Sequence, residues 1–183
     1  MSNTFYSESY LEVIRKVHSN GLWGNVGGKT WDTIVEYCNR FGYKELLDYG
    51  SGHGSLSKAF NEHNVEITIT EYDPGIESKS TLPNPSNFVV CIDVMEHIEE
   101  EYVENVLDDI KRCVLDKGYF AIDMREAGRI LPDGRNAHIT IRPFEWWHAK
   151  LEERFTILES DNFFTRGTFL VQSKNKQEEM EGA

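Results

Sequence analysis

The segment Asp48–Gly54 has the composition of a ligand-binding bend. It reads Asp-Tyr-Gly-Ser-Gly-His-Gly, so glycine stands at alternate positions directly after the apolar pair Leu46-Leu47. Glycine adopts positive φ and lets a ligand approach the backbone closely. The spacing differs from the G-x-G-x-x-G of dinucleotide-binding folds, and a carboxylate ahead of the glycines suits an ammonium group. We therefore expect a cationic ligand at this bend.

A second acidic residue, Asp73, ends the next predicted strand, 25 residues after Asp48. An acid at this place can accept hydrogen bonds from both hydroxyls of a ribose. Strand, glycine bend, helix, strand and acid come in the order that an adenosine-type site requires. The alternative is a glycine-rich turn beside a surface aspartate.

Histidines supply the candidate bases. His97 lies four residues beyond Asp93, where it either takes up a proton or organises the start of the next helix. Asn136 and His138 lie in a glycine-containing loop after a predicted strand, and a neutral imidazole there can accept a proton. The alternative is that Asn136 caps a turn and His138 packs beneath it.

The sequence does not predict a metal site. Glu96 and His97 offer two ligands for a divalent cation, but no third ligand lies close to them in the sequence. The three cysteines, Cys38, Cys91 and Cys113, have no C-x-x-C spacing, so neither zinc nor a disulfide framework is indicated.

The glycine bend, Asp73 and the run Phe88–Ile98 together resemble a class I S-adenosylmethionine-dependent methyltransferase. The run contains Asp-Val-Met-Glu-His-Ile, which is similar to the Asp-Val-Leu-Glu-His of small-molecule members. The resemblance covers about residues 29–173 and implies S-adenosylmethionine as cofactor, with the bend at its methionine part and Asp73 at its ribose. The expected cofactor-binding residues are Lys29, Asp48, Gly50, Ser51, Gly52, Gly54, Tyr72, Asp73, Cys91, Ile92 and Asp93.

The same resemblance implies methyl transfer, an in-line displacement that needs an aligned nucleophile and often a base. We expect Asp93, His97, Asn136 and His138 to act in catalysis. A subset from bacterial and phage genomes, without an agreed substrate, shares Leu-Pro-Asp-Gly-Arg-Asn-Ala-His with this chain. A short chain without a separate recognition domain favours a small-molecule acceptor. The alternatives are a non-catalytic subunit that binds S-adenosylmethionine, and a methyltransferase of protein or RNA.

Alternating strands and helices must position these residues. The patterns predict strands at 45–49, 65–72, 88–92, 119–124, 155–160 and 168–173, and helices within 1–18 and at 31–41, 55–63, 99–115 and 143–153. This order predicts an α/β, Rossmann-like, mostly parallel sheet with helices on both faces and an antiparallel last strand. Only about 14 residues separate Asp73 from Phe88, so we expect the third strand unit to be shortened or missing.

A length of 183 residues predicts one domain. We assign residues 1–173 to it, with a helix and a lid-like loop in residues 1–30, and expect a disordered tail over 174–183. Lys29 ends the glycine-rich loop, where it can approach the methionine carboxylate. Of the adjacent Trp146 and Trp147, we expect one in the core and the other at the acceptor pocket.

A net charge of −12 limits the partners. Such an acidic surface repels phosphate backbones and anionic membranes, so nucleic acid is not expected as a partner, whereas a small molecule can still bind in a local pocket. No apolar run is long enough for a membrane span and no secretory signal is visible, which favours the cytoplasm. The sequence does not predict an oligomeric state.

Overall fold

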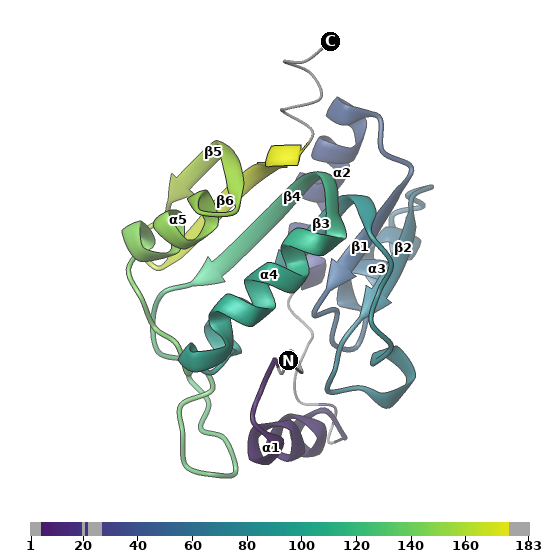
Figure 1. Cartoon of the computed structure of the whole chain (residues 1–183). Coiled ribbons are helices and arrows are strands. Elements are labelled where there is room, and N and C mark those ends of the chain that lie inside the picture. Colours follow the sequence, from purple (N-terminus) through teal and green to yellow (C-terminus); the bar gives the residue numbers. More distant parts are fainter. Residues whose placement is uncertain (1–4, 20, 22–26, 176–183) are drawn as a thin grey trace.

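The computed structural model describes residues 5–19, 21 and 27–175, which form one six-stranded sheet with helices around it (Figure 1). The strand order is β2-β1-β3-β4-β6-β5. Strands β1 to β4 are parallel, and β6 runs antiparallel to both of its neighbours. The strands are β1 Glu45–Tyr49, β2 Thr68–Tyr72, β3 Ser86–Ile92, β4 Val114–Asp123, β5 Phe155–Asn162 and β6 Arg166–Ser173.

Five α-helices accompany the sheet. They are α1 Glu8–Ser19, α2 Trp31–Phe41, α3 Ser55–Glu62, α4 Val103–Cys113 and α5 Phe144–Glu152. Short 3-10 turns cover Gly27–Thr30, Glu77–Lys79, Met95–His97 and Glu100–Tyr102. The predicted α/β, Rossmann-like sheet with an antiparallel last strand is confirmed.

Each face of the sheet has its own apolar core because successive strand residues point to opposite sides. On one face, Val89 and Phe120 pack with residues of α4 and α5, including the fully buried Trp147. On the other face, Val90 and Ala121 pack with residues of α2 and α3. Trp147 is thus the core tryptophan, and Trp146 lies against its ring, with centroids 4.7 Å apart.

The third strand unit is missing, as the short spacing predicted. The chain passes from β2 to β3 through a 3-10 turn, Glu77–Lys79, and no strand lies beyond β2 in the described sheet. The predicted start of the next strand at residue 88 was wrong, because β3 begins at Ser86, which pairs with Val114 of β4.

The prediction that one helix extends from 99 to 115 was also wrong. A 3-10 turn occupies Glu100–Tyr102, and α4 ends at Cys113 because Val114 adopts an extended conformation and starts β4. At the next helix, Pro143 is the extended residue before α5 and not its first helical residue. Residues 22–26 of the expected lid, and 176–183 of the expected tail, lie outside the described residues.

One edge of the sheet collects the polar residues. Parallel strands present their carboxyl ends at the same edge, so the residues that end β1, β2, β3 and β4 lie near one another. The antiparallel β6 begins at this edge, which brings Arg166 there as well. No helix in the described part of the chain has the length and apolar character needed to cross a membrane.

Candidate functional site

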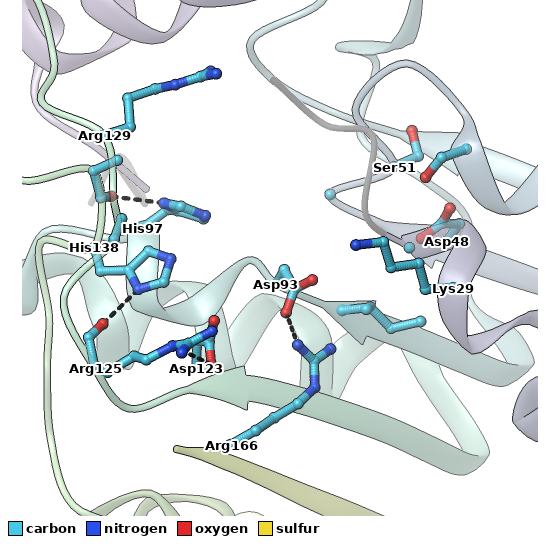
Figure 2. A pocket seen from close by; sticks show the side chains of 16 residues that line it. Lys29, Asp48, Ser51, Asp93, His97, Asp123, Arg125, Arg129, His138 and Arg166 are labelled. Atoms are coloured by element: carbon cyan, nitrogen blue, oxygen red, sulfur yellow. Dashed lines mark hydrogen bonds and ion pairs between the residues drawn. The ribbon is translucent and has the colours of Figure 1, made fainter. Parts of the chain in front are cut away.

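A cavity of about 430 Å³ opens at the carboxyl edge of the sheet. Figure 2 shows side chains from the glycine bend and from the 3-10 turn before α2 on one side and a group of histidines and arginines on the other. On the first side lie Lys29, Asp48 and Ser51; on the other lie His97, Arg125, Arg129 and His138. The ion pair between Asp93 and Arg166 lies between them.

The glycine bend turns sharply because its glycines adopt left-handed conformations. Gly50 has φ 83°, and a Cβ atom at this position would lie 2.3 Å from the Val94 side chain, so only glycine fits. The N–H groups of Gly50 and Ser51 both donate to the carbonyl of Tyr72, which fastens the bend to the end of β2. Ser51 Oγ is buried and has no hydrogen-bond partner.

Asp48 is a buried carboxyl group at the end of β1, 5% exposed. Burial, together with the negative charge of Glu71, raises its pKa to about 7, although Lys79 acts in the opposite direction. The carboxyl group lines the cavity and makes no side-chain hydrogen bond within the described part of the chain. A cation bound here would favour the charged form of this carboxyl group.

Asp73 organises the neighbouring turn. Its two oxygens accept the N–H groups of Gly52 and Gly75, both at 2.8 Å, and His18 Nε2 lies 3.8 Å from one of them. A smaller cavity of about 90 Å³ borders Asp73 and is covered by α1 and the residues before it, through Tyr6, Tyr10, Ile14 and His18. Each carboxylate oxygen keeps a lone pair for a further donor from this cavity.

Asp93 lies directly after β3 with φ 55°, an uncommon conformation for a residue with a side chain. Its backbone N–H donates to Ala121, and its carboxylate pairs with Arg166 at 2.5 Å. Burial raises the pKa of Asp93, although Arg166 opposes the rise. Asp93 lines both cavities, so it lies at the boundary between the space beside Asp73 and the space beside the histidines.

Glu96 and His97 lie on the 3-10 turn that follows. Glu96 is fully buried, its Oε1 accepts the N–H of Asp123 at 3.0 Å, and its Oε2 has no hydrogen-bond partner. Burial raises the pKa of Glu96 to about 8, and the charge of Asp93 adds to the rise. Burial lowers the pKa of His97 to about 3, so its imidazole is neutral at physiological pH.

The loop after β4 carries the second histidine. Asn136 Oδ1 accepts the N–H groups of Ala127 and His138, and its Nδ2 donates to the carbonyl of Ala127. These bonds occupy the amide within the loop, and Asn136 does not line the cavity, whereas His138 does. Asn136 thus bonds within its own loop, as expected if it caps a turn and does not act in catalysis. Its bond to the His138 N–H helps to position that histidine.

The sequence-predicted residues divide into two groups. The cavities are lined by Lys29, Asp48, Gly50, Ser51, Gly52, Asp73, Ile92, Asp93, His97 and His138. The second group does not line the cavities. Tyr72 and Cys91 are buried in the core, and Gly54 lies directly before α3, where a Cβ atom would contact Glu71. The sequence did not predict the arginines of the cavity, Arg125, Arg129 and Arg166, because isolated arginines carry no spacing signal. It also did not predict that α1 covers Asp73.

Comparison with known proteins agrees with this geometry. A family model described as a methyltransferase domain matches residues 12–173. No curated protein matches by sequence.

Solved structures share the fold at low identity. The magnesium protoporphyrin IX methyltransferase of Synechocystis, with S-adenosylhomocysteine bound, has a TM-score of 0.57 and 15% identity over 80% of this chain and 83% of its own. The 1,6-didemethyltoxoflavin N1-methyltransferase of Burkholderia thailandensis, with acceptor and S-adenosylhomocysteine bound, has a TM-score of 0.60 and 17% identity over 90% and 89%. At these identities the likeness shows the fold alone.

Proposed function

This chain belongs to the methyltransferase-domain family, and on that premise we propose that it transfers the methyl group of S-adenosylmethionine to a small-molecule acceptor. The observation that carries the proposal is a pair of adjacent cavities that share Asp93 and His97 in their walls, one bordered by Asp73 and the other by His138. The first offers acceptors for a nucleoside, and the second offers imidazoles. The two solved relatives described above act on small molecules, which supports an acceptor of this class.

The residues present suit this cofactor. Asp48 is placed to pair with the ammonium group of its methionine part, and Lys29 and Ser51 are placed to bind the carboxylate, where the unpartnered Ser51 Oγ gains a hydrogen bond. Asp73 is placed to accept the ribose hydroxyls, and Tyr6 and Tyr10 offer flat surfaces for the adenine. S-adenosylmethionine supplies a methyl group on a positively charged sulfur, which a nucleophile can attack in line.

The histidines serve the acceptor. His138 Nδ1 lies 2.6 Å from the carbonyl of Arg125, and a carbonyl only accepts, so this nitrogen carries the proton. Nε2 then holds the lone pair and can take up the proton that an acceptor hydroxyl or amine releases. Asn136 fixes the loop, and Asp93, held by Arg166, forms the wall between cofactor and acceptor.

The charge of the cavity favours an acidic acceptor. Lys29, Arg125, Arg129 and Arg166 line it together with Asp48, Asp93 and Asp123, so basic side chains exceed carboxyl groups by one, although the chain as a whole carries −12. A carboxylate or phosphate on the acceptor would be attracted into the cavity, whereas the long phosphate backbone of a nucleic acid would meet the acidic surface. We therefore propose a small acidic metabolite, no nucleic-acid or membrane partner, and a cytoplasmic location.

A labelling screen tests this function. The protein is incubated with methyl-labelled S-adenosylmethionine and a cell extract separated by size and charge, and we expect label in an acidic small-molecule fraction. His138→Ala should lose the labelling but still bind S-adenosylhomocysteine, whereas His63→Ala, at an exposed position outside the cavities, should keep both. Label in macromolecules would favour a protein or RNA acceptor. No label despite cofactor binding would favour a non-catalytic subunit.

A further inference from the structure

The fold gathers three potential metal ligands on the acceptor side of the cavity. One ligand atom from each of Glu96, His97 and His138 lies within 4.8 Å of the other two. The sequence argued against a metal because Glu96 and His97 had no third ligand nearby. The loop after β4 supplies that third ligand by placing the His138 ring 4.9 Å from the His97 ring, edge to face.

The two imidazoles are oriented as metal-binding histidines usually are. His97 Nδ1 lies 2.6 Å from the carbonyl of Ala137, and His138 Nδ1 lies 2.6 Å from the carbonyl of Arg125. Because a carbonyl only accepts, each Nδ1 carries the proton, and each Nε2 carries the lone pair that a metal needs. A backbone carbonyl on the other ring nitrogen fixes both the tautomer and the direction of the ring.

The carboxylate provides the second, independent observation. Glu96 is fully buried, and its Oε2 has no hydrogen-bond partner, although an unpaired buried carboxylate oxygen is costly. Oε1 is held by the N–H of Asp123, which fixes the group in place. Two guanidinium groups of the cavity already lie beside other carboxylates, since Arg166 pairs with Asp93 and Arg125 lies 3.9 Å from Asp123.

We propose that Glu96, His97 and His138 bind a divalent transition-metal ion such as Zn²⁺, Mn²⁺ or Fe²⁺ through Oε2 and the two Nε2 atoms. Two imidazoles and one carboxylate form a ligand set that these ions accept while keeping positions open. Ligand atoms on one ion lie roughly 3–3.5 Å apart at bond lengths of about 2.1 Å, so the three side chains need to move inward by only about 1 Å.

The open positions of the ion face the cavity that His138 lines, so they would bind an oxygen of the acceptor. This role, unlike the site itself, rests on the proposed methyl transfer. In this case His138 Nε2 binds the ion and does not act as the base. The ion assists deprotonation instead, because a hydroxyl bound to it loses its proton more readily than a free hydroxyl. An acceptor with a hydroxyl or carboxylate oxygen next to the methylated atom fits this arrangement.

Titration of the untagged, chelator-treated protein with Co²⁺ tests the site without any acceptor. We expect one Co²⁺ per chain, with visible absorption bands of a nitrogen-bound ion. His138→Ala and Glu96→Gln should each weaken Co²⁺ binding at least tenfold, because each removes one of three ligands. Gln has the shape of Glu and can still accept the Asp123 N–H, so the fold should persist. His63→Ala, which removes a histidine far from the cluster in sequence, should bind Co²⁺ like the parent.

The outcomes separate the two proposals. Absence of saturable Co²⁺ binding, or parental Co²⁺ affinity in both ligand variants, would overturn the metal site. Titration of the same samples with S-adenosylhomocysteine reports on the cofactor site alone. Retained Co²⁺ binding without S-adenosylhomocysteine binding would leave the metal site standing and remove the proposed function.

Discussion

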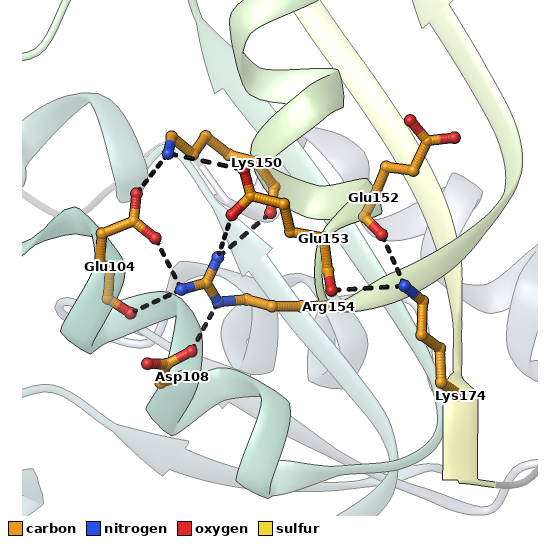
Figure 3. Close-up of polar contacts among 7 residues, drawn as sticks. All are labelled: Glu104, Asp108, Lys150, Glu152, Glu153, Arg154 and Lys174. Atoms are coloured by element: carbon orange, nitrogen blue, oxygen red, sulfur yellow. Dashed lines mark hydrogen bonds and ion pairs between the residues drawn. The ribbon is translucent and has the colours of Figure 1, made fainter.

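Two clusters of charged residues in this molecule are built in opposite ways. Between α4 and α5, Arg154 pairs with Glu104, Asp108 and Glu153 (Figure 3). Lys150 also pairs with Glu104, so every charge at the centre of this cluster has an opposite partner. Among the described residues, Asp48 at the cavity makes no ion pair, and Glu96 Oε2 on the turn after β3 has no hydrogen-bond partner.

The difference indicates what each cluster is for. The carboxylates around Arg154 are 44–57% exposed, so little desolvation opposes their pairing and the cluster joins two helices at small cost. Asp48 and Glu96 are buried, so their unpaired atoms lower the stability of the ligand-free protein. Atoms that are costly when unpaired are the ones a ligand can satisfy, and Asp48 lines the cavity that we propose for the cofactor.

The largest effect should come from Asp73→Ala, which removes the carboxylate proposed for the ribose. We expect the dissociation constant for S-adenosylhomocysteine to rise about 10–100-fold, because a charge-assisted pair of hydrogen bonds is worth about 1.5–3 kcal/mol. Calorimetry measures the change. Asp32→Ala, at an exposed position of α2, is the matched control and should leave the constant unchanged. Binding of Asp73→Ala within twofold of the parent would contradict the assignment.

Asp48→Asn should change stability and binding in opposite directions. The folded protein keeps a proton on Asp48 up to about pH 7, whereas the unfolded chain releases it near pH 3.8, the ordinary pKa of an aspartate. Raising the pH from 4 to 7 therefore favours unfolding. Even half of this pKa rise corresponds to about 2 kcal/mol of stability that the ionised Asp48 costs the folded protein. At pH 8 we therefore expect the free energy of unfolding of Asp48→Asn to exceed that of the parent by about 2 kcal/mol, while the variant binds S-adenosylmethionine more weakly.

Denaturant unfolding at several pH values checks the sign. The advantage of Asp48→Asn over the parent should vanish below pH 4, where Asp48 is protonated in both states, and be complete above about pH 7. An advantage that is constant between pH 4 and 8 would show that Asp48 does not titrate as its burial implies.

Arg154→Met should affect stability alone. The substitution keeps most of the apolar stem of the 10% exposed side chain but removes its three ion pairs, so we expect a loss of about 1 kcal/mol in the free energy of unfolding. The loss should shrink at high salt, and cofactor affinity should match the parent. Arg40→Met, which removes an exposed pair with Glu159, should lose less. A weakened cofactor affinity in Arg154→Met would contradict the separation of the two clusters.

The smallest effect should come from Lys29→Ala. Lys29 lines the cavity from an exposed position, so its attraction for the methionine carboxylate is screened and should be worth about threefold in affinity. Thermal stability should not change. Unchanged cofactor affinity would remove Lys29 from the binding site.

The fold was predictable because its signals are local. The run from Phe88 to Ile92 is apolar throughout, which marks a strand buried on both faces, and the short spacing after Asp73 leaves no room for another strand and helix. The helix boundary at Cys113 was not predictable, because Val114 continues an apolar pattern and becomes a strand through pairing with Ser86. Pairing between distant residues overrides such local patterns.

The candidate site was predictable only where strand ends carry it. Asp48, Asp73 and Asp93 each follow a recognisable strand, and all three line the cavities. Arg166 reaches Asp93 only because β6 runs antiparallel beside β4, and His138 reaches His97 through a loop whose path Asn136 sets. Neither contact leaves a spacing signal in the sequence.

Helix α1, which covers Asp73, is synthesised early but is held by residues that come much later in the chain. Tyr10 donates to the carbonyl of His97, and Ser7 donates to Glu99, so the contacts that hold α1 span 87 and 92 residues. During synthesis α1 leaves the ribosome long before its partners exist, and closing so long a loop is slow. The pocket that we propose for the nucleoside is therefore complete only once β3 and the turn after it have formed.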